Sequence, residues 1–495
     1  MTVSLQAEST APIVVYALAK DDGLPKELSA IAKKYKIEAN LLENDFKAGL
    51  KESFSFYTHQ KTIQQVYLLG LGDKAGFAEV LSAFRSFIFQ KKSKIGFHIA
   101  IDMSRWTKKT LDAKWIDAIA NGLVLGRYDI GLYKTDKKDV PVFISGDAKI
   151  DIVTPIFDDT ELSNALNQGL RTAETQLRIF DLVNAPGNKK TPTHLAKWAE
   201  KSAKQYGFKT TILDKKDLEK EKLGALLSVS RGSAEDPVLI VMEYKAKGIK
   251  DAPTIGLIGK GVTFDTGGVS IKPSTGMHQM KSDMGGAAAV LGTLELVAKL
   301  GLPINVIGIV PSTENCVDGK STKPGDVITS YAGKTIEVID TDAEGRLILC
   351  DAISYMLKNY KPDTLIDLAT LTGSVIATLG FAAAGMFTNN DQLANDLSVT
   401  GLKYGEKLWR LPLWDAYKDD LNSDVADLRN FSGKPYAGAI TAAKFLEAFT
   451  DNHASWAHLD IAGVAFTDGE FASMKSSTAY GIRLLSEYIG GRVKG

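Results

Sequence analysis

The sequence predicts an α/β protein with a smaller N-terminal α/β domain and a larger C-terminal domain, whose mostly parallel sheet is flanked by helices. The chain has 495 residues, 44% of them hydrophobic and 24% charged, and one hydrophobic core does not normally cover a chain of that length. Strand-like and helix-like segments alternate along it, which is the order of an α/β fold. The strand-like runs of the second part are apolar throughout, as in parallel strands buried on both faces.

The N-terminal part alternates short apolar runs with helical segments such as residues 77–89. Four of the apolar runs have the pattern of strands and lie at residues 12–18, 64–70, 94–102 and 140–146. From about Asp159 to Leu182 the apolar residues recur every three or four positions, which predicts one long helix. We place the domain boundary in this helix, with an N-terminal domain at residues 1–165 and a second domain at residues 166–495.

The second domain contains five apolar runs that we expect to be strands of its sheet. These runs lie at residues 238–244, 254–259, 304–310, 364–369 and 456–463. The clearest helices between them are residues 284–300 and 345–360. In folds of this kind ligands bind beyond the carboxyl ends of the strands. Polar residues that directly follow a strand are therefore the first candidates for a site.

Composition restricts the classes of protein to consider. Lys plus Arg and Asp plus Glu each number 59, so the formal net charge is zero, which argues against a chain that mainly coats nucleic acid or an anionic membrane. The first residues lack the pattern of a signal peptide, and no apolar run reaches the roughly 20 residues of a membrane span. The two cysteines, Cys316 and Cys350, indicate a reducing compartment and exclude a cysteine-built zinc site. We expect a cytoplasmic protein with small partners.

Charged residues stand at the ends of the predicted strands. Lys260 and Asp265 follow the run that ends at residue 259, and Asp283 precedes a helix. Asp342 and Glu344 follow a short apolar run and are two residues apart, so in an extended segment their side chains face the same way. Four carboxylates gathered at one edge of a sheet would repel one another unless a cation neutralised them.

A metal site is the simplest explanation of this cluster. Carboxylate oxygens suit Mn, Mg and Zn, and a neutral Lys amine can complete the coordination when the ion suppresses its protonation. One carboxylate can bridge two ions about 3.5 to 4 Å apart, which would make a two-metal site. The alternative is that the acids are helix caps and loop charges, since an Asp before a helix is commonly a cap. That alternative applies best to Asp283 taken alone.

Two further cations lie close to the acids in the sequence. Lys272 lies in the segment SIKPSTG, and Arg346 follows Glu344 and Gly345. Either side chain could polarise a carbonyl group or hold an anion at the start of the helix that begins there. Taken singly, each is more simply explained as a surface or salt-bridge residue.

Several longer stretches make the chain similar to a known family. They are GKGVTFDTGGVSIKP, MKSDMGGAAAV, DTDAEGRLIL, DLATLTG, SDVADLRN with AGAITAAKFL, and WAHLDIAG. In this order they resemble the leucyl aminopeptidase family, the dinuclear-metal cytosol aminopeptidases, and the resemblance covers most of the chain from Leu182 onward. The N-terminal domain matches more loosely, through pieces such as VYLLGLGDK.

The resemblance implies a metal-binding role for each residue of the cluster. Asp265 and Glu344 would bridge two divalent ions, which are Mn or Zn in this interpretation, with Mg as a further option. Asp342 would complete one of the two sites. Lys260 and Asp283 would complete the other.

The resemblance also implies roles for residues around the metals. Lys272 would polarise the scissile carbonyl group and stabilise the tetrahedral intermediate. Arg346 would hold a bicarbonate-like anion that serves as general base. The pocket for the first side chain of the substrate would be lined by Met280, Thr370, Gly373 and Ala462.

Two positions depart from the family pattern. Asp340 stands where the family has Asn at the start of Asn-Thr-Asp-Ala-Glu-Gly-Arg. Because residues 340, 342 and 344 have the same parity in an extended segment, we expect the Asp340 carboxylate to point toward the metal ligands and to strengthen metal retention. The alternative is that Asp340 accepts a local backbone hydrogen bond. His278 stands where an acid is common, and we interpret it as a residue at the rim of the site.

These expectations combine into one function. We expect a metal-dependent aminopeptidase that hydrolyses the N-terminal bond of short peptides with a free N-terminus, prefers leucine-like residues and assembles as a homohexamer. A two-metal phosphoester hydrolase could use the same acids, although a Lys among the ligands and the absence of ligand histidines argue against it. A DNA-binding or scaffolding role alongside peptidase activity is the other alternative, and the neutral composition makes nucleic acid a secondary partner.

Overall fold

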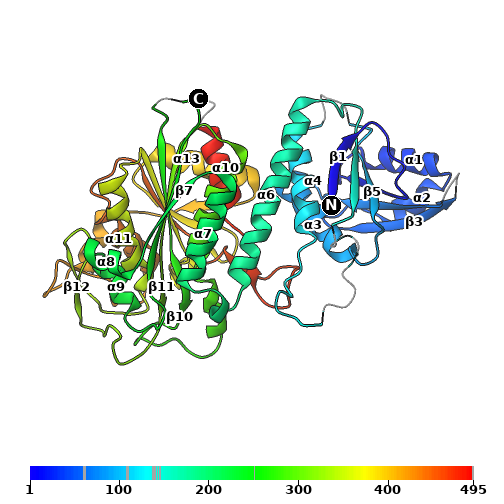
Figure 1. Cartoon of the computed structure of the whole chain (residues 1–495). Coiled ribbons are helices and arrows are strands. Elements are labelled where there is room, and N and C mark those ends of the chain that lie inside the picture. Colours follow the sequence, from blue (N-terminus) through cyan, green and yellow to red (C-terminus); the bar gives the residue numbers. More distant parts are fainter. Residues whose placement is uncertain are drawn as a thin grey trace. The chain divides into compact units, whose positions relative to one another are not determined.

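The computed structural model describes residues 1–59, 63–106, 111–136, 141, 143, 146–249 and 251–492. The chain forms two compact units, Met1–Leu177 and Arg178–Gly495. Each unit is an α/β structure built on a sheet of its own (Figure 1). The predicted fold class, a smaller α/β domain followed by a larger one with a mostly parallel sheet, is confirmed. In the described part of the chain, no helix is both long enough and apolar enough to span a membrane.

The first unit contains a six-stranded sheet in the order β1-β6-β5-β2-β4-β3. Its strands are β1 (Thr2–Gln6), β2 (Ile13–Leu18), β3 (Ser53–His59), β4 (Ile63–Gly70), β5 (His98–Asp102) and β6 (Lys149–Val153). Neighbouring strands are parallel except β3 and β4, which are antiparallel. The strand expected at residues 140–146 lies mostly outside the described residues.

The first unit also contains helices. They are α1 (Leu24–Tyr35), α2 (Ala39–Asp45), α3 (Phe77–Lys91) and α4 (Ala113–Leu125). The long helix α6 (Thr160–Asn184) includes nearly all of the segment 159–182, whose apolar periodicity predicts one helix. The division between the two units falls within α6.

The second unit contains a nine-stranded sheet in the order β16-β15-β18-β14-β9-β11-β8-β7, with β10 pairing beside β11. Its strands are β7 (Lys209–Leu213), β8 (Val238–Tyr244), β9 (Thr254–Gly259), β10 (Gly261–Asp265), β11 (Asn305–Asn315), β14 (Thr364–Ala369), β15 (Ala384–Thr388), β16 (Leu408–Arg410) and β18 (Trp456–Asp460). The strands β18, β14, β9, β11 and β10 are parallel, so their carboxyl ends meet at one edge.

One strand of the second unit differs from the expected direction. The run 238–244 was expected among the parallel strands, but β8 is antiparallel to β11. Its residues are nevertheless almost all buried. A continuous apolar run reports burial on both faces and does not depend on strand direction, which explains the difference.

Helices cover both faces of this sheet. One face packs against α7 (Pro192–Tyr206), α10 (Gly285–Leu300) and α13 (Asp391–Tyr404), and α15 (Ile482–Gly491) packs on α10 and α13. The other packs against α9 (Gly224–Ser230) and α11 (Glu344–Asn359), and α14 (Gly438–Glu447) packs on α11. Figure 1 shows α7 and α10 on one side of the strands and α9 and α11 on the other. The core between the sheet and α11 includes Trp456, Phe445 and Ile348.

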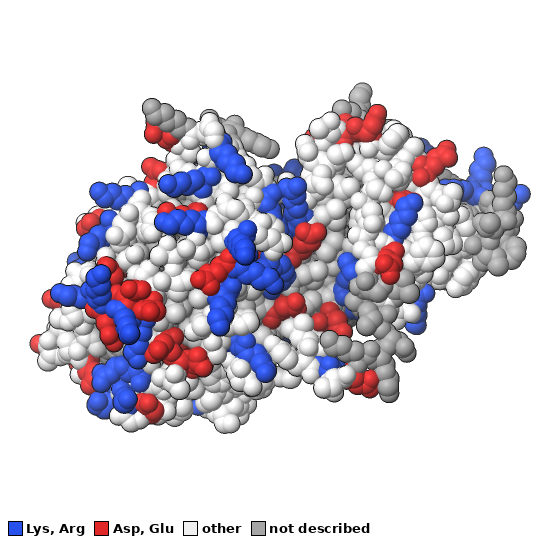
Figure 2. All heavy atoms as spheres, in the orientation of Figure 1, with Lys and Arg blue, Asp and Glu red and all other residues white. Residues whose placement is uncertain are grey.

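Smaller elements complete the second unit. They are α8 (Lys215–Glu221), α12 (Gly373–Leu379), the 3₁₀ turns at Gly187–Lys189, Met277–Ser282, Asp415–Tyr417 and Asp419–Leu421, the three-stranded sheet of β12 (Val327–Thr329), β13 (Thr335–Glu337) and β17 (Leu428–Arg429), and the hairpin of β19 (Phe466–Thr467) and β20 (Ser476–Ser477). On the face drawn in Figure 2, basic and acidic side chains are interspersed, which agrees with the zero net charge.

Candidate active site

The five predicted metal ligands meet at the carboxyl edge of the parallel strands. Lys260 directly follows β9, and Asp265 is the last residue of β10. Asp283 lies between the turn Met277–Ser282 and α10, Asp342 lies in the turn before α11, and Glu344 is the first residue of α11. Close packing at this edge requires glycine at position 286, because a Cβ on Gly286 would lie 2.0 Å from the carbonyl oxygen of Leu368.

Three carboxylates of this set converge. One oxygen from each of Asp265, Asp342 and Glu344 lies within 4.8 Å of the others. Asp265 and Glu344 are buried, whereas the Asp342 side chain is 34% exposed. Burial, together with the charges of Asp265 and Glu344, raises the pKa of Asp342 to about 7. Burial and the neighbouring like charges therefore disfavour the ionised form of Asp342, even beside Lys272.

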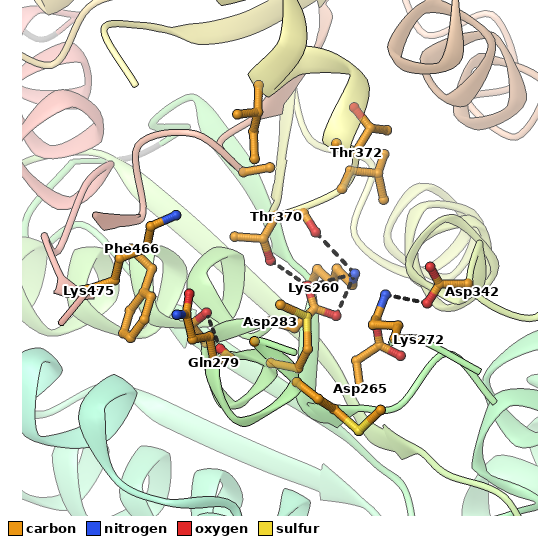
Figure 3. Close-up of a pocket in the computed structure, with 18 of the residues that line it drawn as sticks. Lys260, Asp265, Lys272, Gln279, Asp283, Asp342, Thr370, Thr372, Phe466 and Lys475 are labelled. Atoms are coloured by element: carbon orange, nitrogen blue, oxygen red, sulfur yellow. Dashed lines mark hydrogen bonds and ion pairs between the residues drawn. The ribbon is translucent and has the colours of Figure 1, made fainter. Parts of the chain in front are cut away.

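Two lysines neutralise the acids in the structure. Lys260 Nζ lies 2.7 Å from Asp283 Oδ2 and 2.7 Å from Glu344 Oε1. Lys272 Nζ lies 2.8 Å from Asp265 Oδ2 and also forms an ion pair with Asp342 (Figure 3). Burial disfavours both ammonium groups, but the adjacent carboxylates raise the pKa of each above its ordinary value.

The donor set fits divalent cations. The buried atom Glu344 Oε2 has no hydrogen-bond partner among the described residues. Burial and the charge of Asp265 raise the pKa of Glu344, and burial raises that of Asp283. Carboxylate oxygens that converge on one point are the hard donors that Mn, Mg and Zn accept, and a lysine amine supplies a nitrogen donor.

Arg346 lies in the first turn of α11, two residues after Glu344, and is buried. Its guanidinium Nη1 donates to the carbonyl oxygen of Asn430 at 2.9 Å, while its buried Nε has no partner in the described part of the chain. Burial lowers the pKa of Arg346 to about 10, still well above neutral pH, so the side chain remains a cation. A buried cation with an unused N–H donor fits a small anion.

A cavity of about 490 Å³ opens beside the acids. Its lining includes all four residues expected to contact the first side chain of a substrate, namely Met280, Thr370, Gly373 and Ala462. Thr370 connects the cavity to the cluster, because its hydroxyl group donates to Asp283 Oδ1 at 2.8 Å and its carbonyl oxygen accepts from Lys260 Nζ at 3.1 Å. The structure thus brings the expected pocket residues and the expected metal ligands into one site. His278 is exposed.

Several residues that support the site were not predicted from the sequence. Asn315 donates to Asp265 Oδ1 at 2.8 Å. Asp460 accepts hydrogen bonds from the backbone of Leu371 and Ala462 and from the hydroxyl group of Thr372, so it positions the loop that carries the pocket residues. Asn315 and Asp460 are the last residues of β11 and β18. The rule that identified Asp265, a polar residue at a strand end, could have found both.

The expected inward orientation of Asp340 is wrong. Asp340 Oδ1 accepts a hydrogen bond from the backbone N–H of Asp342 at 2.8 Å, and Asp340 does not line the cavity. The parity argument fails because β13 ends at Glu337 and residues 341–342 form a turn, so the segment is not extended. Asp342 and Glu344 converge because of this turn instead.

Asp340→Asn is therefore expected to have little effect on metal retention. An Asn side chain keeps an Oδ1 acceptor for the Asp342 N–H, so the turn is preserved. Chelator titration of wild type and variant should give curves that superimpose within about twofold, as expected for a charge outside the cluster. Loss of metal from the Asn variant at clearly lower chelator concentration would show that the charge of Asp340 does strengthen metal retention.

Gly345→Ala is expected to disturb the cluster while leaving the fold intact. A Cβ at Gly345 would lie 2.6 Å from Lys260 Cε and 2.7 Å from Lys260 Nζ, so the ammonium group would have to move. We expect about a 10- to 100-fold loss of activity, the range seen when residues that orient metal ligands are changed. Activity, metal content and melting temperature are the measurements.

Gly490→Ala is the matched control for this change. Gly490 also lies in a helix, and a Cβ there meets no atom of the described residues within 4 Å. The control should keep full activity, since alanine is favoured over glycine inside helices. If Gly345→Ala had the same activity and metal content as Gly490→Ala, the close approach of residue 345 to Lys260 would not matter for function.

The fold and the site together define a class of protein. Carboxylates and a lysine that converge at the carboxyl edge of an α/β sheet, beside a cavity, are the machinery of a metal-dependent hydrolase. The chain belongs to the cytosol aminopeptidase family: the model of the catalytic domain matches residues 179–486 and that of the N-terminal domain matches residues 13–137. It is therefore a metal-dependent aminopeptidase.

Individual relatives agree with this assignment. The chain is 42% identical over 478 residues to a probable cytosol aminopeptidase of Chlorobium phaeobacteroides, with 94% of each chain covered. It is 42% identical over 478 residues to one of Chloroherpeton thalassium, with 93% of each covered. A solved structure, the bottromycin maturation enzyme BotP in complex with Mn, matches with a TM-score of 0.83 and 31% identity over 98% of this chain and 100% of that one. These comparisons give no support to the phosphoester hydrolase or DNA-binding alternatives.

Proposed function

We propose that this aminopeptidase removes leucine-like residues from the free N-terminus of short peptides, by a two-metal mechanism. The observation that carries the proposal is the continuity of the acid cluster with a cavity lined by Met280, Ala462, Thr370 and Gly373. The thioether and methyl groups of this wall suit an apolar first side chain. The acids beside it suit the positive charge of a free α-amine.

We assign the metal ligands as the family resemblance implies. Asp265 and Glu344 would bridge two divalent ions, Asp342 would complete one site, and Lys260 and Asp283 would complete the other. Bound ions would supply Lewis acidity and a water nucleophile at neutral pH. Mn and Zn are the proposed ions, with Mg as a further option, and Mn has the support of a solved relative described in complex with it.

Two cations of the chain would act on the reacting groups. Lys272 would donate a hydrogen bond from Nζ to the scissile carbonyl oxygen, and this bond strengthens as negative charge develops in the tetrahedral intermediate. Arg346 would hold a bicarbonate-like anion through its unused Nε donor and so place a general base beside the cluster. Asp460 would keep the pocket loop in place through its three hydrogen bonds.

Assembly and location form part of the proposal. We propose a homohexamer, as in the family that the sequence resembles, with support from large apolar side chains exposed on the single chain, among them Trp409, Trp414 and Tyr436. Light scattering that shows a fully active monomer would contradict it. We place the protein in the cytoplasm because its named relatives are cytosol aminopeptidases and its two cysteines are free.

The test of the proposed function compares leucine p-nitroanilide with its N-acetylated form. We expect hydrolysis of the free amine only, loss of activity with chelator, and recovery with Mn, Zn or Mg. Equal hydrolysis of the acetylated substrate would exclude an aminopeptidase mechanism. Activity that persists after the metal has been shown to be removed would exclude the two-metal mechanism.

A further inference from the structure

Lys475 differs from the other lysines that line the cavity. Lys260 and Lys272 each lie between two carboxylates. Lys475 has no ion pair and donates no hydrogen bond to any residue in the described ranges. Its ammonium group lies 4.7 Å from the centre of the Phe381 ring. A cation–π contact of this kind restrains the ammonium group and leaves its N–H donors free for a ligand.

The local fold fixes the position of Lys475. It directly precedes β20, which pairs antiparallel with β19, so Ser477 lies opposite Phe466. Two hydrogen bonds fix the end of this hairpin. The N–H of Thr478 donates to the carbonyl oxygen of Ala465 at 3.1 Å, and the Thr478 hydroxyl group donates to the carbonyl oxygen of Val464 at 2.6 Å. The side chain is half-buried. Lys475 is therefore held at the cavity wall by an anchored hairpin.

Lys475 and the metal cluster occupy different sides of the cavity. In Figure 3, Lys475 and Phe466 lie on one side, and Lys272 and Asp342 lie on the other, with Lys260 between them. Phe466 is buried and lines the same cavity. A substrate amine and scissile carbonyl group beside the acids would leave the first side chain directed toward the wall that Phe466, Ala462 and Lys475 form.

We propose that Lys475 is a specificity-determining residue that binds the carboxylate of an acidic first residue, so that peptides beginning with Glu or Asp are substrates beside leucine-like ones. The methylene groups of a Glu side chain would pack on Phe466 and Ala462, and its carboxylate would accept a hydrogen bond from Lys475 Nζ. A lysine or arginine in the first position would be repelled by the same ammonium group. This inference rests on the proposed function, because it places the first residue in the same cavity.

The experiment compares an acidic first residue with its neutral isostere. The measured quantity is the ratio of kcat/KM for Glu-Ala-Ala-amide to that for Gln-Ala-Ala-amide, since the terminal amide removes every other carboxylate from the peptide. The enzymes are wild type, Lys475→Met, Lys475→Arg and Lys358→Met. Lys358 is a matched control because its ammonium group also lies over a ring, 4.8 Å from the centre of Tyr331, while it does not line the cavity.

We expect the Glu/Gln ratio of kcat/KM to fall about two- to fivefold in Lys475→Met, which corresponds to the free energy of a partly exposed ion pair. Lys475→Arg should restore most of the ratio, and Lys358→Met should leave it unchanged. An unchanged ratio in Lys475→Met would overturn the proposal.

A second comparison tests the other carboxylate that a short peptide carries, its free C-terminus. Wild type and Lys475→Met are compared on Leu-Ala and Leu-Ala-amide. The ratio of kcat/KM for Leu-Ala to that for Leu-Ala-amide should be the same in wild type and in Lys475→Met. A fall in this ratio without a fall in the Glu/Gln ratio would assign Lys475 to the C-terminal carboxylate and overturn the proposal.

The proposed function and the role of Lys475 fail separately. If wild type hydrolyses Leu-Ala-amide and Lys475 does not affect the Glu/Gln ratio, only the role of Lys475 fails. If wild type hydrolyses none of the peptides, the proposed function fails, and calorimetric binding of glutamic acid α-amide and glutamine α-amide still tests Lys475. A preference for the glutamic acid amide that is lost in Lys475→Met would support the role, and equal binding by wild type would refute it.

Discussion

Asp265→Asn and Glu344→Gln should each lower peptidase activity by more than about a hundredfold and reduce metal content. Substitution of residues that merely support metal ligands already lowers metal affinity or activity by about 10- to 100-fold. Both substitutions keep the size of the side chain and remove the negative charge. Asn in place of Asp265 can still accept from the backbone N–H of Gly267, which Asp265 does at 2.9 Å. The fold should therefore survive, and loss of activity would report the site itself.

The control for these variants is Asp318→Asn, which removes the charge of an exposed acid that does not line the cavity. It should leave both activity and metal content unchanged. Elemental analysis, turnover of leucine p-nitroanilide and melting temperature are measured on the same preparations. Full metal occupancy with normal turnover in Asp265→Asn would contradict the assignment of Asp265 as a ligand of a two-metal site.

Lys272→Met should slow turnover on the order of a hundredfold, the usual cost of losing one oxyanion donor, while metal is retained. Lys272 is paired with Asp265 and Asp342, so its removal takes a positive charge away from the acids. Divalent ions should consequently bind at least as tightly as in wild type, which distinguishes Lys272 from a metal ligand.

The decisive comparison for Lys272 is between kcat and KM, with Lys358→Met as the surface control. A fall in kcat with little change in KM indicates that the interaction forms in the transition state. A change confined to KM would reassign Lys272 to substrate binding. Loss of metal in Lys272→Met would instead show that this lysine supports the metal site.

The sequence predicts the catalytic unit best where burial leaves a strong pattern. The strand β9 is an apolar run followed at once by Lys260, so this residue could be placed at the edge of the sheet. Thr370 and Ala462 were expected at the pocket only because of the family resemblance. The short strand β1 is half-exposed and carries no comparable pattern. The direction of β8 could not be predicted, because burial on both faces produces the same apolar run in either direction.

Site features that depend on distant contacts were not predictable from local patterns. Arg346 contacts Asn430, 84 positions away, and no local pattern shows that its guanidinium is buried. The orientation of Asp340 depends on a turn that the parity argument treated as extended chain. Lys475 reaches the cavity because two two-residue strands, β19 and β20, pair across a loop, and strands this short leave no periodic signal.

The dependence of activity on two bound ions is tested by a metal titration of chelator-treated protein, in which bound metal and peptidase rate are followed together. In the proposed mechanism, one site for two divalent ions is formed by Lys260, Asp265, Asp283, Asp342 and Glu344, and peptide hydrolysis requires both ions. We expect Mn binding to saturate at two ions per chain and activity on leucine p-nitroanilide to rise with occupancy. The variant Asp265→Asn should show neither behaviour. Saturation at a single ion with full activity, or full activity with no bound metal, would contradict the proposed mechanism.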